Sequence, residues 1–535
     1  MIKRLPVIVS FLFVLLIANG SFGQAPSIQW SKCFGGSDGD GGESIIKTSD
    51  GGYAIIGSTG SNDGQVSGNH GLADIWFIKL DSAGNLQFQK CFGGPDSEEG
   101  RCLIQTMDHG YILAGTTNSI SGDVTGGGYH GGFPTVDFWV VKVDSIGNLQ
   151  WQKCYGGSNN DYPLSIVQTY DSGFAICGYV FSDDGDVTGI HSLDTSDIWV
   201  IKIDNTGNLI WQGCYGGTDI DEAHSIIQAS DSSLLIAGFT LSNDGDVIGN
   251  HGLGSSDCWI LKLNQSGNLL SQKCLGGTGY DFAYSIIQTV DMGFMIAGFS
   301  GSNDGDVSGN HGSSDYWIVK LNFQMVLQWE YSYGGTMYEW VNSILQCNDS
   351  TFLILGTTDS NDGDVSGYHG NGDIWVINID YFGNLQWEYC LGGTANEFLY
   401  TSPMIQNNDR SIIIASTSYS NDGDVSGNHG LADVWVVKLY PSNVGLGSPS
   451  NLNSDFSVYY NCSSEEVAIS FTDNLNESIR IHLMDVTGRI LQMQAIYSIP
   501  GLNKITIPVN SFTPGIYLVR LETNTSNVTR RVVVE

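Results

Sequence analysis

The chain has 535 residues, which is long for a single domain unless the sequence is built from repeats. Its 56 acidic and 21 basic side chains give a net charge of -35, which argues against nucleic acid and anionic membrane surfaces as partners. Seventy glycines, eleven prolines and 11% aromatic residues are typical of many short strands joined by turns.

Residues 1–23 have the pattern of a signal peptide. Lys3 and Arg4 precede an apolar run from Leu5 to Ala18, and small residues follow up to Gly23. The run is too short for a spanning helix, and no later stretch approaches the ~18 apolar residues of a transmembrane segment. The sequence therefore predicts an exported, soluble protein that is cleaved after Gly23 and has no transmembrane segment.

Residues 24–442 contain seven copies of one repeat, with a period of 58 to 63 residues. Each copy carries four short runs with strand character, such as HSIIQAS, LLIAGFT, DCWILKLN and LLSQKCL. Turns such as TSDGGY and DNTGNL predict that the first two strands and the last two strands form hairpins. The copies are marked by Gly-Gly pairs that end at Gly36, Gly94, Gly157, Gly217, Gly277, Gly335 and Gly393.

This organisation predicts an all-β fold, a seven-bladed β-propeller with four-stranded blades. The array opens at Ile28 with an isolated fourth strand and ends at Asp433 with a third strand, so we expect these two strands to pair and close the ring. Six cysteines share one strand position, and we expect buried thiols there rather than disulfides, because equivalent positions on different blades lie too far apart. They are Cys33, Cys91, Cys154, Cys214, Cys274 and Cys390.

Residues 443–454 have the composition of a linker, and residues 455–535 have the periodicity of a small β-sandwich domain. The segments FSVYYNCSSEEVAISF, IRIHLMDVTGRIL, LNKITIPVNSFTPGIYLVRLET and VTRRVVVE resemble the type A C-terminal sorting domain of the type IX secretion system. This resemblance implies contact with the type IX machinery, passage across the outer membrane and removal of the domain. The repeats resemble propeller repeats found upstream of such domains.

The long connection between the second and third strands carries the motif SNDGDVSGNHG. In three copies its acids, serine and glycine have the spacing of an EF-hand-type calcium loop, although the loops join strands and end in Asp. The alternative is a series of Asx-turns without metal. The candidate calcium ligands are Asp304, Asp306, Ser308, Asp315, Asp362, Asp364, Ser366, Asp373, Asp422, Asp424, Ser426 and Asp433.

Two further sets of side chains repeat on the same predicted face. An acid stands four residues after each Gly-Gly pair, and these acids either fix their loops through backbone N–H groups or form a ring that binds a cation or ligand. One histidine per long loop cannot converge on one zinc ion, because the loops are spread around the ring. The acids are Asp40, Glu98, Asp161, Asp221, Asp281, Glu339 and Glu397.

The sequence favours a binding protein over an enzyme. The TSDGGY turns resemble the Asp-box of sialidases, but only Arg101 and Arg410 lie between residues 24 and 454, too few for the arginine cluster that holds a sialidase substrate. No nucleophile with a nearby base departs from the repeat, and we interpret the remaining asymmetry as drift. Recurring tryptophans are expected in the core. The aromatic residues expected to contact a ligand are Tyr129, Tyr162, Tyr280, Tyr338, Trp340 and Tyr368.

The sequence therefore predicts a secreted or cell-surface protein, expected to be monomeric, that acts as a binding or adhesion module for a glycan or a protein. The alternative is a hydrolase or lyase that acts on polysaccharide, with its site on the acidic loop face. Calcium is the one cofactor that the sequence suggests.

Overall fold

The computed structural model describes residues 25–132, 134–252, 254–347, 351–401, 403–440, 457–461, 466–473, 478–486, 489–497, 501–510, 512–522 and 527–534. The chain divides into two compact units, of which one is Gln24–Ser442 and the other contains the C-terminal strands. The predicted signal peptide and the linker over 443–454 lie outside the described residues. Among the described residues, no helix has the length and apolar character needed to cross a membrane.

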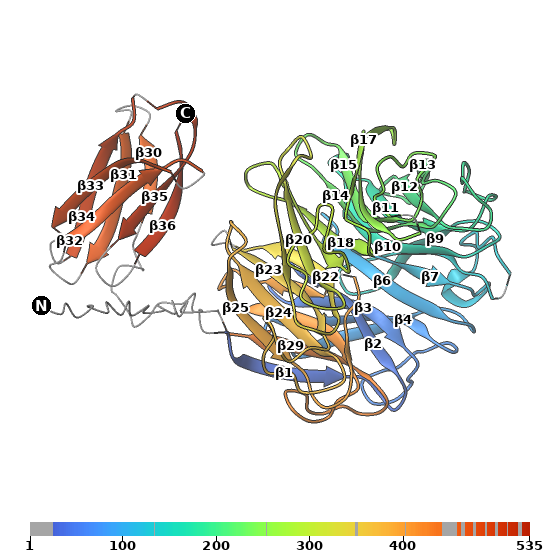
Figure 1. The fold of residues 1–535 in the computed structure, drawn as a ribbon. Helices are drawn as coiled ribbons and strands as arrows, with labels where there is room; N and C mark the ends of the chain where they lie inside the picture. The colour runs from blue at the N-terminus through green and yellow to red at the C-terminus, as the bar shows by residue number, and fades with distance from the viewer. Residues whose placement is uncertain are drawn as a thin grey trace, which may run out of the picture. The chain divides into compact units, whose positions relative to one another are not determined.

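The unit Gln24–Ser442 is built of antiparallel sheets, six of which contain four consecutive strands (Figure 1). Sheet 1 holds β2 (Asp40–Lys47), β3 (Tyr53–Thr59), β4 (Asp74–Leu80) and β5 (Leu86–Phe92). Sheet 2 holds β6 (Glu98–Gln105), β7 (Tyr111–Thr117), β8 (Asp137–Val143) and β9 (Leu149–Tyr155). Sheet 3 holds β10 (Asp161–Gln168), β11 (Phe174–Val180), β12 (Asp197–Ile203) and β13 (Leu209–Tyr215).

The next three sheets repeat this arrangement. Sheet 4 holds β14 (Asp221–Gln228), β15 (Leu234–Thr240), β16 (Asp257–Leu263) and β17 (Leu269–Leu275). Sheet 5 holds β18 (Asp281–Gln288), β19 (Phe294–Ser300), β20 (Asp315–Leu321) and β21 (Leu327–Tyr333). Sheet 6 holds β22 (Glu339–Gln346), β23 (Phe352–Thr358), β24 (Asp373–Ile379) and β25 (Leu385–Leu391). A 3₁₀ turn, η1 (Gly122–Val124), lies in the long loop of sheet 2.

Sheet 7 combines the two ends of the unit. It holds β26 (Glu397–Phe398), β27 (Met404–Gln406), β28 (Ile412–Ser418), β29 (Asp433–Leu439) and β1 (Ile28–Phe34). The strand that begins at Ile28 pairs antiparallel with the strand that begins at Asp433, as the sequence predicts. The innermost strand of sheet 7 is interrupted. Its two parts, β26 and β27, both pair with β28 but are separated by residues 399–403.

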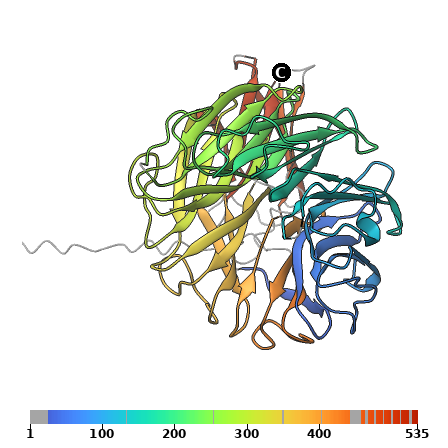
Figure 2. The same ribbon diagram turned by 90° about the vertical axis from the view of Figure 1, so that its right-hand side faces the viewer.

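One backbone hydrogen bond links each sheet to the next. The first residue of each innermost strand donates its N–H to the carbonyl that precedes the third strand of the preceding sheet, as Glu98 does to Ala73 at 2.8 Å. The same bond runs from Asp40 of sheet 1 to Ala432 of sheet 7, also at 2.8 Å. Figure 2 shows the sheets following one another around a common centre, a propeller-like arrangement.

The core lies between neighbouring sheets. The recurring tryptophan of each third strand is fully buried, as the sequence predicts, and in β12 the ring of Trp199 lies 4.8 Å from that of Phe138 in the preceding sheet. These tryptophans are Trp76, Trp139, Trp199, Trp259, Trp317, Trp375 and Trp435. The cysteines of the described part of the chain are free thiols, and five of the six repeated ones are buried as predicted, whereas Cys214 is half-buried.

The second unit contains two antiparallel sheets in its described residues. The first holds β30 (Ser457–Asn461), β31 (Glu466–Asp473) and β34 (Gly501–Pro508). The second holds β33 (Ile490–Tyr497), β32 (Ser478–Met484), β35 (Gly515–Glu522) and β36 (Asn527–Val534), in that order. Val467 and Ile507 of the first sheet share a buried apolar cluster with Ile481 and Val519 of the second, so the two sheets pack face to face.

Candidate binding pocket

The acids that follow the Gly-Gly pairs fix the backbone. In sheet 1 the carboxylate of Asp40 accepts the N–H of Gly36 at 2.7 Å, and the other sheets repeat this bond. All seven acids are buried, and burial raises the pKa of Asp161 and Asp221 to about 7. This geometry agrees with the interpretation that the acids hold their loops.

The first two aspartates of each predicted calcium loop lie near the segment that links neighbouring sheets. Asp304 accepts the N–H and the hydroxyl of Thr278 at 2.7 and 3.0 Å. Asp362 and Asp422 make the same two contacts with the threonines of their own linking segments. Asp364 and Asp424 accept backbone N–H groups of Gly334 and Gly392 at 3.2 and 3.4 Å, and Asp306 Oδ2 lies 4.0 Å from His251 Nε2.

The serine and the closing aspartate of these loops face other partners. Ser308 and Ser366 donate to glutamates of the outermost strands at 2.6 and 2.5 Å, and Ser426 is exposed. Each closing aspartate is buried and accepts from the histidine of its own loop, Nδ1 to Oδ2, at 2.5, 2.7 and 2.5 Å. These aspartates are Asp315, Asp373 and Asp433.

Most oxygens of the predicted calcium loops are thus engaged by separate groups of the protein, although Oδ1 of each closing aspartate is buried without a hydrogen-bond partner. Within the described ranges of the chain, no cluster of three or more His, Cys, Asp or Glu side chains is arranged to hold a metal ion. Calcium binding stays a prediction. The histidine of each long loop pairs with an aspartate of the same loop in all seven sheets, from His70 with Asp74 to His429 with Asp433. These seven histidines therefore do not meet at one common site.

A β-bulge lies at the same place in six innermost strands. In sheet 1 the pairing between β2 and β3 skips one residue between Gly42 and Ser44. The skipped residue differs in every sheet, although the acid three residues before it is always Asp or Glu. The skipped residues are Glu43, Arg101, Leu164, His224, Tyr284 and Asn342.

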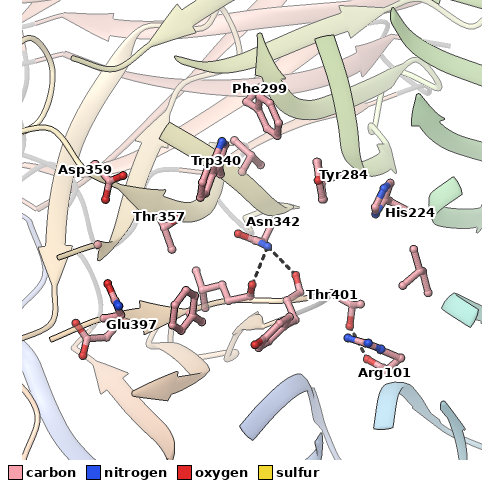
Figure 3. A pocket seen from close by; sticks show the side chains of 17 residues that line it. Arg101, His224, Tyr284, Phe299, Trp340, Asn342, Thr357, Asp359, Glu397 and Thr401 are labelled. Carbon is pink, nitrogen blue, oxygen red and sulfur yellow. Dashed lines mark hydrogen bonds between the residues drawn. The ribbon is translucent and has the colours of Figure 1, made fainter. Parts of the chain in front are cut away.

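The bulges converge on a pocket of about 600 Å³ at the centre of the unit (Figure 3). All of the bulge residues except Glu43 line it. Because a bulge turns one side chain out of the ladder, this device places a different group from each sheet into a common cavity. The other lining residues are Phe299, Trp340, Val341, Thr357, Asp359, Gly372, Asn396, Glu397, Phe398, Leu399, Tyr400 and Thr401.

Aromatic rings form a continuous wall on sheets 4 to 6. The ring of His224 lies 4.3 Å from that of Tyr284, which lies 5.8 Å from Phe299, which in turn lies 6.4 Å from Trp340. Burial lowers the pKa of His224 to about 4, so this imidazole is neutral at pH 7. Trp340 and Phe398 remain 48% and 41% exposed, so their faces are open to a ligand.

Arg101 is the only lysine or arginine among the lining residues, and its charge is compensated. Its guanidinium lies 2.5 Å from the carboxylate of Glu99 and 3.5 Å from that of Glu43. Burial raises the pKa of Glu43 to about 8, although the charge of Arg101 opposes this shift. The guanidinium and the two carboxylates together carry no net positive charge.

Residues 399–401 cross the pocket. In sheet 7 the acid Glu397 stands seven positions before Met404, which pairs with Ile414 of the second strand. In sheet 1 the acid Asp40 stands only five positions before Ile45, which makes the equivalent pair with Ile55. The first strand of sheet 7 therefore has two additional residues. Asn342 donates to the carbonyls of Leu399 and Tyr400 at 3.1 and 2.9 Å, as the dashed lines in Figure 3 show. Thr401 donates to the carbonyl of Arg101 at 2.5 Å. The insertion thus ties sheet 7 to sheets 2 and 6.

Of the six aromatic residues that the sequence offered as ligand contacts, Trp340 alone lines the pocket. Tyr280 and Tyr338 are exposed, and the ring of Tyr338 lies 6.1 Å from that of Trp340. Tyr162 stacks on Tyr179 at 5.0 Å. The hydroxyls of Tyr129 and Tyr368 bind the backbone of their own loops, so these two rings serve loop structure.

The interpretation of repeat asymmetry as drift missed the bulge residues. The signal was present, because the position three residues after the acid reads Glu, Arg, Leu, His, Tyr and Asn in sheets 1 to 6. The next position is Ser in five of these sheets and Cys in the other, so the variation is local.

Comparison with known proteins finds a family for the C-terminal unit and distant likeness for the repeats. Over 192 residues the chain is 26% identical to the regulatory protein FlaEY of Caulobacter vibrioides, which covers 35% of this chain and 20% of that protein. The chain therefore spans about a fifth of the length of this relative.

Similar solved structures share little sequence with the chain. Sqt1 from Chaetomium thermophilum is 11% identical, with 77% of this chain and 100% of that chain covered and a TM-score of 0.39. Puromycin hydrolase is 7% identical, with 82% and 59% covered and a TM-score of 0.41. Drosophila Plexin A, in complex with Semaphorin 1b, is 8% identical, with 78% and 88% covered and a TM-score of 0.41.

Residues 457–535 match the family described as the secretion system C-terminal sorting domain. The match covers the described strands β30 to β36 and agrees with the resemblance seen in the sequence. The C-terminal unit is therefore a type IX secretion sorting domain, which indicates a secreted or cell-surface protein.

Proposed function

We propose that residues 24–442 form a closed seven-bladed β-propeller that binds a glycan in its central pocket. One observation carries the proposal: the bulge residues of neighbouring sheets are chemically different, and five of them line one cavity. Identical side chains at this position would be enough for a symmetric scaffold. A specific ligand instead requires a small number of unlike, convergent groups, which these bulges supply.

The pocket has properties that suit a sugar. Its volume of about 600 Å³ lies within the ~300–1,000 Å³ of ligand sites. Trp340 and Phe398 present half-exposed rings, on which the apolar face of a sugar ring can stack. Asn396 and Thr357 line the same cavity and offer hydrogen-bonding groups to sugar hydroxyls. The sorting domain supports this proposal, because a secreted or cell-surface protein meets extracellular glycans and host surfaces.

A glycan array followed by calorimetric titration with the purified full chain tests the proposal. Trp340→Ala should weaken the best glycan about tenfold or more, since an aromatic anchor is typically worth ~2 kcal/mol. Tyr170→Ala is the matched control, because this ring is 66% exposed on a tight turn outside the pocket lining.

Three outcomes would count against the proposal. Glycan affinity that is the same in Trp340→Ala and in Tyr170→Ala would place the site elsewhere. Binding to host proteins without any glycan would make the module a protein adhesin. Release of reducing ends from a polysaccharide, without a tight ligand, would favour the alternative of a hydrolase or lyase.

A further inference from the structure

Asp359 presents an uncommitted carboxylate to the pocket. It follows β23 directly and is half-buried among the lining residues. Its backbone N–H donates to Tyr338 at 2.9 Å, but within the described part of the chain its carboxylate has no hydrogen-bond or ionic partner. A half-buried carboxylate loses hydration without compensation, so a positively charged partner would offset the cost of its burial.

The aromatic wall lies next to this carboxylate. Thr357, two residues before Asp359, pairs directly with Trp340 in the neighbouring strand, and Figure 3 shows the three side chains together at one side of the pocket. The face of an indole ring attracts a cation that lies within ~6 Å of its centre. A carboxylate beside an indole is therefore a combination that selects an ammonium group over an acidic one.

The charge distribution of the repeat unit also favours a cationic ligand in the pocket. The repeat lysines pair with aspartates of the tight turns, such as Lys79 with Asp50 at 2.9 Å and Lys142 with Asp108 at 3.0 Å, at the strand ends remote from the long loops. The long loops carry the acidic motif, and Asp359 and Gly372 of the loop in sheet 6 line the pocket. An acidic cleft with low-dielectric walls concentrates cations. Arg101 does not reverse this field, because the carboxylate of Glu99 compensates its charge at 2.5 Å.

We infer that the glycan taken by the pocket carries a free ammonium group, as an oligomer of glucosamine does, with the ammonium between Asp359 and Trp340. This inference rests on the glycan-binding function proposed above. It adds the charge of the ligand, which excludes uronic acids and other acidic sugars as preferred ligands.

The test is a calorimetric comparison of three tetramers with the full chain at pH 6. The glucosamine tetramer should bind about tenfold or more tightly than the N-acetylglucosamine tetramer, which has the same backbone without the charge. The galacturonate tetramer should not bind. Asp359→Asn should remove the preference for the charged form, while Asp219→Asn, an exposed acid outside the pocket lining, should preserve it.

The outcomes separate this inference from the proposed function. If the acetylated tetramer binds as tightly as the charged one and Trp340→Ala abolishes both, the pocket binds glycans but the inference is wrong. Preferred binding of galacturonate would overturn it and assign the anion to Arg101. An unchanged preference in Asp359→Asn would also overturn it. If no tetramer binds while the glycan array finds a ligand without an ammonium group, the inference is wrong and the proposed function stands. If no glycan of the array binds either, both are wrong.

Discussion

Replacing Val180 by threonine should stabilise the repeat unit, because it supplies a missing hydrogen bond to a buried acid. In five of the other six sheets a threonine or serine pairs with the acid of the innermost strand and donates to it, as Thr117 does to Glu98 Oε1 at 2.7 Å. In sheet 3 this position is Val180, which pairs with Asp161 and is fully buried. Asp161 Oδ1 is buried without a hydrogen-bond partner.

The expected gain is about 1 kcal/mol at pH 8. A hydrogen bond to a charged group contributes about 1.5–3 kcal/mol, and the loss of one buried methyl group costs about 0.8 kcal/mol. Burial raises the pKa of Asp161 to about 7, so between about pH 4 and 7 the folded protein holds a proton that the unfolded chain has released. The stability that this proton provides is lost as the pH rises through 7. The new hydroxyl should lower the pKa of Asp161 in the folded protein. For each pKa unit by which it does so, the gain in free energy of unfolding is ~1.4 kcal/mol larger at pH 8 than at pH 5.

Urea unfolding followed by tryptophan fluorescence measures this effect, because all 13 tryptophans lie between Trp30 and Trp435 and report on the repeat unit alone. Thr117→Val is the matched control and should lower the free energy of unfolding by about 1–3 kcal/mol, since it leaves the Glu98 carboxylate without its hydroxyl. If Val180→Thr instead destabilises the unit equally at pH 5 and pH 8, the hydroxyl is only a buried polar group and the reasoning is refuted.

Two further predictions concern calcium and processing. Calcium should raise the melting temperature of the full chain and give heat on titration with a Kd of about 10⁻⁴ to 10⁻³ M. The double substitution Asp304→Ala and Asp306→Ala should remove the contribution of one loop. If several millimolar calcium gives no heat and no thermal shift, these loops form turns and bind no calcium. Intact-mass analysis of the extracellular protein should find cleavage near Gly23 and again before Asp455, and a free, soluble form that retains Glu535 would contradict removal of the sorting domain.

Strands and turns were predictable because each follows from local chemistry. The Asp-Gly turns fix hairpins, and the recurring tryptophan of the third strand marks the buried face in every copy. The pairing of the strand from Ile28 with the strand from Asp433 followed from counting, since four-stranded units left one strand over at each end. The acid after each Gly-Gly pair could be assigned to the backbone, because buried amides need acceptors.

The pocket was not predictable in the same way. A strand pattern alternates between two faces, and a β-bulge breaks that alternation without changing the length of the repeat, because sheets 1 to 6 all contain it. Residues such as Arg101 and His224 therefore look like scattered substitutions in a half-buried strand. The two additional residues of sheet 7 are countable between Glu397 and Asn407, but their hydrogen bonds to Asn342 and Arg101 depend on sheets that the sequence does not place side by side.

The bulge also explains how a symmetric scaffold can carry an asymmetric site. A residue skipped by the ladder takes no place in the strand pairing, so the pairing does not fix which side chain stands there. The neighbouring positions cannot change so freely, because Ser44 and its equivalents pair with the second strand and the preceding acids hold the Gly-Gly backbone. The bulge position can therefore vary without disturbing the ladder, and its side chain faces the central pocket. In this architecture, a ligand can select the side chain that strand pairing leaves unspecified.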